Sequence, residues 1–129
     1  MDNIMFCSCG RRATLLKDFR KSMNGCGKIV ATDMSPVAPA LFMADETYLV
    51  PRIDDPSYYE HVLDICEKSK VKAITTLIDP EIEILAKNRE DLLSKGILPL
   101  CPADWTARLC YDKYEMFKYL HDKGVRTIL

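Results

Sequence analysis

Short apolar runs rich in β-branched residues alternate along this chain with segments whose apolar residues recur at helical spacing. This alternation is typical of a parallel sheet covered by helices on both faces. We therefore expect an α/β fold, a Rossmann-like open parallel sheet of about five strands. The predicted strands cover residues 4–8, 29–32, 48–50, 73–78 and 97–100, and the predicted helices cover 12–22, a segment after Pro56, 80–95, 103–109 and 112–123.

Turn and cap residues predict where several of these elements begin and end. Asp79 is placed to cap the third helix, with Pro80 in its first turn, and Gly96 is placed just beyond its end. Pro99 cannot donate to a sheet ladder, so the last strand should lie near an edge or end early. Asp112 precedes Glu115 by three residues, the arrangement of a capping box.

The size and charge of the chain narrow the classes of partner. Its 129 residues favour one domain, and 18 basic against 19 acidic residues give a net charge of −1. The chain has no net positive charge that would attract a nucleic acid or an anionic membrane, so we expect neither as a partner. There is no run of membrane-helix length and no secretory signal, so we expect a cytoplasmic protein. The apolar tail 125–129 has no partner in the chain and suggests a piece of a longer protein.

The cysteines and histidines do not form a metal-binding pattern. Cys7 and Cys9 stand two apart, which would place both on one face of a strand, but zinc needs four ligands. His61 and His121 sit in predicted helices without paired ligands. We expect reduced thiols and no metal site, and the loop position of Cys9 leaves its reactivity open. Buried, unreactive thiols are predicted for Cys66, Cys101 and Cys110.

The candidate site is the edge of the sheet at which the parallel strands end, where ligands bind in such folds. Gly10 allows a tight turn into the first helix, whose free N–H groups make an anion site. Arg11 and Arg12 add positive charge at the positive end of that helix, which is favourable if a carboxylate or phosphate neutralises them. The alternative is an ion pair with one of three acids nearby, or simple solvation; these acids are Asp33, Asp79 and Glu81.

Those three acids also have structural explanations. Asp33 stands 23 residues after Gly10, as does the ribose-binding acid of a dinucleotide fold, but the partner glycines are missing and an NAD-dependent enzyme is disfavoured. Capping of its own loop explains Asp33 equally well. Asp79 is explained as a cap, and Glu81 as a first-turn acid that suits the helix dipole. We therefore assign no catalytic residue.

Several segments together resemble the pre-ATP-grasp domain that opens ATP-grasp ligases, in the carbamoyl-phosphate synthase large-subunit-like branch. The resemblance rests on residues 9–12, 31–35, 38–41, 44–45, 48–51, 76–81, 112–114 and 124–127. It implies a Rossmann-like substrate domain in front of an ATP-grasp fold. Such enzymes phosphorylate a carboxylate with Mg-ATP, and an amine then attacks the acyl phosphate. The resemblance also implies a boundary, with residues 1–110 forming the pre-ATP-grasp domain and 111–129 beginning a truncated ATP-grasp region.

The resemblance further implies which residues meet ligands. Lys113 matches a lysine that reaches nucleotide phosphates, whereas a second lysine and the magnesium ligands would lie beyond Leu129. ATP and Mg²⁺ would thus act in the parent protein, and the fragment alone would be inactive and hold no cofactor tightly. The implied partners are small carboxylate and amine substrates, the missing ATP-grasp domain and a possible second copy. Arg11, Arg12, Asp79 and Glu81 match positions that face the cleft in such ligases. Together with Gly10 and Asp33, they are the predicted substrate-binding residues.

A second hypothesis from another class stays open. The chain would then be a stand-alone Rossmann-like module that binds a small anion or a partner protein without catalysis.

Overall fold

The computed structural model describes residues 1–127 and contains a five-stranded sheet in which every pair of neighbours is parallel. The strand order is β3-β2-β1-β4-β5, so the first strand lies at the centre. The predicted α/β class and open parallel sheet are confirmed. The strands are β1 (Asn3–Cys7), β2 (Ile29–Asp33), β3 (Glu46–Leu49), β4 (Val71–Thr76) and β5 (Leu98–Pro99).

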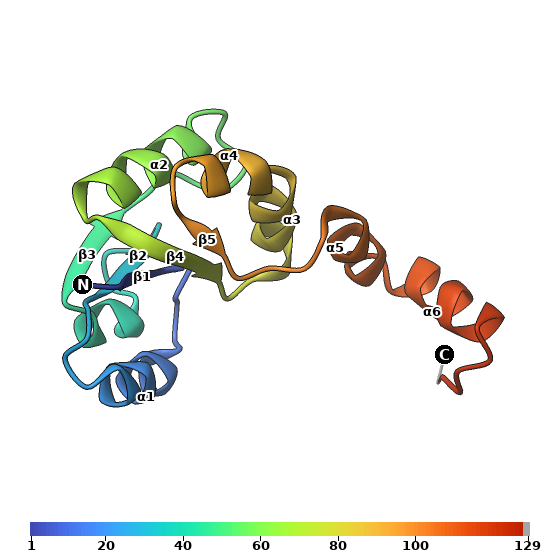
Figure 1. Ribbon diagram of the computed structural model, residues 1–129. Coiled ribbons are helices and arrows are strands. Elements are labelled where there is room, and N and C mark those ends of the chain that lie inside the picture. The colour runs from blue at the N-terminus through green and yellow to red at the C-terminus, as the bar shows by residue number, and fades with distance from the viewer. Residues whose placement is uncertain (128–129) are drawn as a thin grey trace.

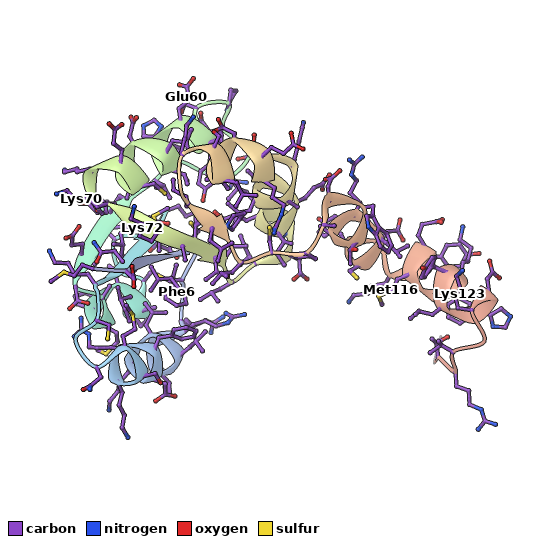
Figure 2. All side chains as sticks on the ribbon, viewed as in Figure 1. Phe6, Glu60, Lys70, Lys72, Met116 and Lys123 are labelled. Carbon is purple, nitrogen blue, oxygen red and sulfur yellow. The ribbon has the colours of Figure 1, made fainter. Side chains whose placement is uncertain are left out.

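Helices cover both faces of this sheet (Figure 1). The first face carries α1 (Ala13–Met23) and a 3-10 turn, η1 (Pro39–Met43), and the second face carries α2 (Tyr58–Lys68), α3 (Asp79–Lys87) and α4 (Arg89–Ser94). All five residues of β1 are buried because both faces are covered. Phe6 of β1 points toward α1 (Figure 2) and meets Phe19 edge to face, with ring centroids 4.8 Å apart.

The last two helices leave the sheet. Helix α5 (Asp104–Tyr111) packs on α3, and α6 (Lys113–Asp122) continues away from the body of the domain (Figure 1). Asp112 caps α6 as predicted, because its carboxylate accepts from the backbone N–H groups of Tyr114 and Glu115 at 3.0 and 3.1 Å. No residue of α6 is buried.

Several predicted element boundaries are wrong for identifiable reasons. The fourth strand ends at Thr76 instead of residue 78, because the Thr76 hydroxyl accepts from the N–H of Ile78 and turns the chain. Asp79 is the first residue of α3, and its side chain does not cap the helix, because the cap position belongs to extended Ile78. The helix predicted over 80–95 is interrupted at Asn88, whose side chain donates to the Ile84 carbonyl.

Other boundaries shift by smaller amounts. The third strand begins at Glu46 and not at residue 48, and no sequence pattern predicted η1. Gly96 takes a positive φ of 73° just past α4, as predicted for a residue beyond a helix end. Pro99 lies in β5 at the edge of the sheet, which confirms the predicted edge position.

The cysteines occupy different surroundings from those expected. Cys7 and Cys9 lie in two separate apolar clusters on opposite faces of the sheet, because Ser8 between them has a φ of 47° and breaks the strand alternation. Cys9 is fully buried, and burial raises the pKa of its thiol to about 11, so the structure does not support a reactive thiolate there. Cys66 is buried as predicted, Cys101 is half-buried, and the prediction for Cys110 is wrong because this thiol is exposed.

None of the helices within residues 1–127 has the length and apolar content needed to cross a bilayer. Val125, at the start of the predicted apolar tail, is 48% exposed, and residues 128–129 of that tail lie outside the described part of the chain.

Candidate functional site

The loops after β1, β2 and β4 lie at one edge of the sheet, because the carboxyl ends of parallel strands share an edge. The strand order reverses direction between β1 and β4, so the loops after these two strands flank the switch point where ligands bind in open α/β sheets. We call this edge the carboxyl rim and define it by residues 8–12, 33–35 and 79–81.

A single carboxylate joins two loops of the carboxyl rim. Asp33 Oδ2 accepts from the backbone N–H of Gly10 at 2.8 Å, and Asp33 Oδ1 accepts from that of Ser35 at 2.9 Å. Asp33 is only 8% exposed. The prediction that Asp33 caps its own loop is confirmed, and the same side chain also fixes the position of the Gly10 turn.

The Gly10 turn has the geometry that the sequence predicted. Gly10 has a φ of 49°, in the left-handed region that glycine adopts without strain. Its carbonyl accepts from the N–H of Ala40 at 3.0 Å, which ties the turn to η1. The N–H of Arg12 donates to the Cys9 carbonyl at 3.0 Å, so the chain turns sharply into α1.

The amino end of α1 lacks a cap. Arg12 occupies the cap position, no side chain bonds to the first-turn N–H groups, and the first turn contains no acid. Arg11 and Arg12 are both exposed, and neither forms an ion pair with any residue in 1–127. An ion pair with Asp33, Asp79 or Glu81 is therefore wrong, whereas the exposure of both side chains agrees with the other alternative, simple solvation. Uncapped N–H groups and two unpaired guanidinium groups leave this helix end suited to an anion.

Glu81 is the second buried acid near the carboxyl rim. Its side chain is fully enclosed, and its two carboxylate oxygens accept hydrogen bonds from the hydroxyls of Tyr58 and Thr76. Burial raises the pKa of Glu81 to about 7; a hydrogen bond from Ser8 opposes this rise and the nearby charge of Asp33 adds to it. Glu81 thus titrates near neutral pH, within reach of the loop that carries Gly10.

Sequence reasoning missed the partner of this acid. Tyr58 is almost fully buried and its hydroxyl reaches Glu81 across 23 positions of sequence. The neighbouring Tyr59 is only partly buried and donates to Asp91 at 2.9 Å. A polar group at the amino end of an amphipathic helix was the one available signal, and it does not specify a partner on another element.

The remaining predicted residues do not join this cluster. Asp79 is exposed in the first turn of α3, where its charge suits the helix dipole. Lys113 is exposed at the start of α6, which lies apart from the sheet (Figure 1). The structure therefore brings Gly10, Asp33, Ser8 and Glu81 together and leaves Lys113 outside the carboxyl rim.

The side chains that could hold a metal ion are scattered. Within residues 1–127, no three His, Cys, Asp or Glu side chains gather closely enough to bind one. The described residues therefore do not fit a magnesium site.

Comparisons with known proteins agree on this architecture. The sequence matches the PylC-like, N-terminal domain family over residues 4–100. No curated protein matches the chain. The solved structures that share its fold include a ligase and two synthetases. The L-amino acid ligase of Bacillus licheniformis has a TM-score of 0.72 at 17% identity, over 98% of this chain and 31% of that one.

The other two structures are synthetases. The N5-carboxyaminoimidazole ribonucleotide synthetase of Thermotoga maritima has a TM-score of 0.67 at 22% identity, over 96% of this chain and 31% of that one. The N5-carboxyaminoimidazole synthetase of Staphylococcus aureus, solved with ADP, has a TM-score of 0.68 at 17% identity, over 99% and 31%. The chain thus spans about a third of each of these proteins.

The sheet order shows an open α/β fold, and the family match identifies the chain as a domain of the pre-ATP-grasp type, as the sequence resemblance implied. Within that class, the chain belongs to the PylC-like N-terminal domain family.

Removal of the Asp33 carboxylate should loosen the carboxyl rim. We expect Asp33→Ala to lower the free energy of unfolding by about 2 to 3 kcal/mol, because two backbone N–H groups lose a charged acceptor. Urea denaturation measures the change. Asp18→Ala, on the exposed side of α1, is the matched control and should change stability by less than about 0.5 kcal/mol. Equal effects of the two substitutions would contradict the role of Asp33.

Glu81 should make stability depend on pH near neutrality. Its pKa is raised in the folded state to about 7, so the folded protein holds the proton more tightly, and stability falls as pH rises from about 5 to 8. Glu81→Gln should remove about 2 to 3 kcal/mol of this dependence, as measured by urea denaturation at both pH values. Glu90→Gln, an exposed acid on α4, should leave the dependence unchanged. An unaltered pH profile in Glu81→Gln would refute the buried titration.

Proposed function

We propose that this chain is the N-terminal substrate domain of an ATP-dependent ligase that joins a carboxylate to an amine. The observation that carries the proposal is the uncapped amino end of α1 with its two unpaired arginines, placed beside the switch point of the sheet. Two further findings support it. The chain belongs to the PylC-like N-terminal domain family, and its fold matches about one third of each of two synthetases and a ligase.

The carboxyl rim suits the carboxylate substrate. A carboxylate at the first turn of α1 would accept from free backbone N–H groups and pair with Arg11 or Arg12. Gly10 brings the backbone close because it has no side chain, and Asp33 holds that turn in place. Asp79 would border the amine, whose charge suits an exposed acid. Glu81 would not touch the substrate, because its carboxylate is enclosed. It would influence the site indirectly, through its hydrogen bond with Ser8 in the turn beside Gly10.

The reaction proposed for the whole protein has two steps. A carboxylate oxygen of the substrate attacks the γ-phosphorus of ATP and ADP leaves, which gives an acyl phosphate. The amine nitrogen then attacks the acyl carbon and inorganic phosphate leaves. This chain would bind and orient the carboxylate, and the following ATP-grasp domain, beginning near residue 111, would hold the nucleotide. Lys113 would reach a nucleotide phosphate from that boundary, and Mg²⁺ would be held by residues outside this chain.

The cellular location and the branch of the ligase family are part of the same proposal. We place the protein in the cytoplasm, where ATP is available, and keep the carbamoyl-phosphate synthase-like branch as a prediction. The stand-alone anion-binding module is not favoured, because the chain resembles one part of longer enzymes. A second copy as partner stays a prediction.

Release of ADP tests the proposal. We expect the full-length protein with Mg-ATP to release ADP when a suitable carboxylate is supplied, tested over amino acids and small dicarboxylates. Hydroxylamine should trap the acyl phosphate as a hydroxamate. The 129-residue chain alone should release none. A full-length protein that forms neither ADP nor hydroxamate with any carboxylate would overturn the proposal.

The two arginines should affect the carboxylate selectively. We expect the double substitution Arg11→Ala and Arg12→Ala to raise the KM for the carboxylate about tenfold or more, because a charge-assisted pair is lost, while the KM for ATP stays nearly constant. Steady-state ADP release measures both constants. Lys21→Ala, at the other end of α1, is the control and should change neither KM. An unchanged KM for the carboxylate in the double variant would remove the arginines from the site.

A further inference from the structure

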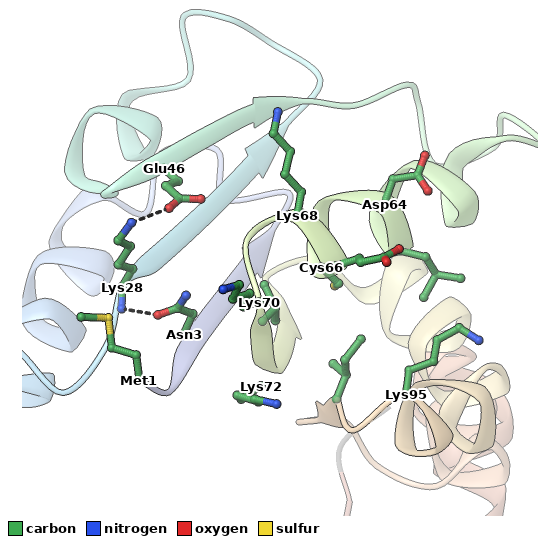
Figure 3. Close-up of a pocket in the computed structure, with 14 residues that line it drawn as sticks. Met1, Asn3, Lys28, Glu46, Asp64, Cys66, Lys68, Lys70, Lys72 and Lys95 are labelled. Atoms are coloured by element: carbon green, nitrogen blue, oxygen red, sulfur yellow. Dashed lines mark hydrogen bonds and ion pairs between the residues drawn. The ribbon is translucent and has the colours of Figure 1, made fainter.

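A large cavity opens at the amino ends of the strands, on the opposite edge of the sheet from the carboxyl rim (Figure 3). Its volume is about 1120 Å³. It is lined by the starts of β1, β3 and β4, by residue 28 before β2, by residues 95 and 97 before β5, and by the last turns of α2. Typical pockets for small molecules measure about 300 to 1000 Å³, so a ligand of nucleotide size fits this opening.

The walls of this cavity carry more positive than negative charge. Five lysines border it against three acids. In Figure 3, Lys28 and Lys95 lie on opposite sides of the opening, and Lys70 and Lys72 lie between them. The five lysines are Lys28, Lys68, Lys70, Lys72 and Lys95, and the three acids are Glu46, Asp64 and Glu67.

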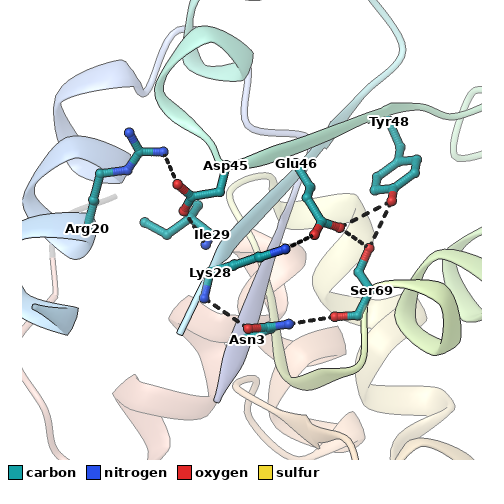
Figure 4. A network of polar contacts seen from close by, with 8 residues as sticks. All are labelled: Asn3, Arg20, Lys28, Ile29, Asp45, Glu46, Tyr48 and Ser69. Atoms are coloured by element: carbon teal, nitrogen blue, oxygen red, sulfur yellow. Dashed lines mark hydrogen bonds and ion pairs between the residues drawn. The ribbon is translucent and has the colours of Figure 1, made fainter. Parts of the chain in front are cut away.

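A hydrogen-bonded floor already uses one of these acids (Figure 4). Glu46 accepts from Lys28 Nζ at 2.8 Å and from the Ser69 hydroxyl at 2.7 Å, and the Lys28 contact is the main cause of its lowered pKa. Asn3 donates to the Ser69 carbonyl at 2.7 Å and accepts from the Lys28 backbone N–H at 2.9 Å. Asn3 and Ser69 are buried, so the floor is fixed before any ligand arrives.

The lysines differ in what they already contact. Lys95 pairs with Asp91 at 2.8 Å, and Lys68 lies over the Tyr48 ring at 5.1 Å. Lys70 and Lys72 are exposed and form no ion pair with any other described side chain. These two ammonium groups are therefore available to a ligand.

The carboxyl end of α2 explains part of this charge but not all of it. A helix end carries about half a negative charge, which favours a lysine in its last turn. Two of its final carbonyls are already bonded, since Ile65 accepts from Ser69 N–H at 2.9 Å and Glu67 accepts from Lys70 N–H at 3.1 Å. Half a charge balances at most one lysine, and Lys72 lies on β4, beyond this end.

We propose that this cavity binds a small molecule that carries two or more phosphate groups. The phosphates would lie between the ammonium groups of Lys70 and Lys72, and the rest of the ligand would pack on the apolar lining around Leu63, Val71 and Ile97. This site is separate from the carboxyl rim, because the two occupy opposite edges of one sheet. It therefore takes its ligand independently of the carboxylate substrate.

Titration with inorganic tripolyphosphate tests the site. We measure its affinity for the full-length protein by calorimetry. The double substitution Lys70→Gln and Lys72→Gln should weaken binding at least tenfold, and added salt should weaken binding to the unmodified protein more steeply than to this variant. Lys17→Gln with Lys21→Gln, on α1 across the sheet, is the matched control and should change affinity less than twofold.

Further arms separate this site from the ligase site. Arg11→Ala with Arg12→Ala should leave tripolyphosphate binding intact, and Lys70→Gln with Lys72→Gln should leave the KM values for ATP and carboxylate intact. Parallel titrations with ADP and with tripolyphosphate, each compared between the unmodified protein and the Lys70, Lys72 variant, distinguish a nucleotide ligand from an inorganic one, because the proposed ATP-grasp site is the same in both proteins. Equal affinity of the unmodified protein and the Lys70, Lys72 variant, or no binding at millimolar tripolyphosphate, would overturn the inference. A full-length protein inactive with ATP would leave this result standing.

Discussion

The central strand β1 is the constraint on which the rest of the structure depends. It pairs with β2 on one side and β4 on the other, so its residues are buried laterally by neighbours and on both faces by helices. Five consecutive buried residues leave no room for a polar side chain except at the start, where Asn3 is satisfied by Ser69. Because β1 is fixed, the loop after it must begin at the centre of the sheet edge, where the strand order reverses direction.

Charge is distributed differently at the two edges of this sheet. At the carboxyl rim, Asp33 binds backbone N–H groups and Glu81 is enclosed, so the exposed charges are those of Arg11, Arg12 and Asp79. At the amino edge, Glu46 neutralises Lys28, whereas Lys70 and Lys72 form no ion pair with any described side chain. Positive charge is free at both edges although the whole chain has a net charge of −1. The net charge of the chain therefore does not predict whether it binds small anions. It does argue against binding of a polyanion, which needs one continuous basic surface.

The sequence predicted the carboxyl rim better than the roles of its residues. Gly10 and Arg12 were identified correctly as a turn and a helix start because local chain geometry depends on neighbours in sequence. The sequence pattern predicts Asp79 as a cap, but Asp79 is the first helical residue of α3, and a shift of one residue changes the role of a side chain at a helix end. Cys7 and Cys9 were placed on one face because alternation assumes an unbroken strand, and Ser8 breaks it.

The order of apolar runs, turn residues and caps by itself determined that this chain forms a parallel sheet with helices on both faces, because each signal acts over a few neighbouring residues. Only the tertiary structure decided that Tyr58 meets Glu81, that Asp33 holds Gly10, and that lysines from α2, from β4, from the end of α4 at its C-cap and from the loops before β2 and β4 surround one cavity. These contacts join residues that lie far apart in sequence. Local sequence patterns do not distinguish these contacts from many other possible pairings, and burial and hydrogen bonding in the folded chain select them.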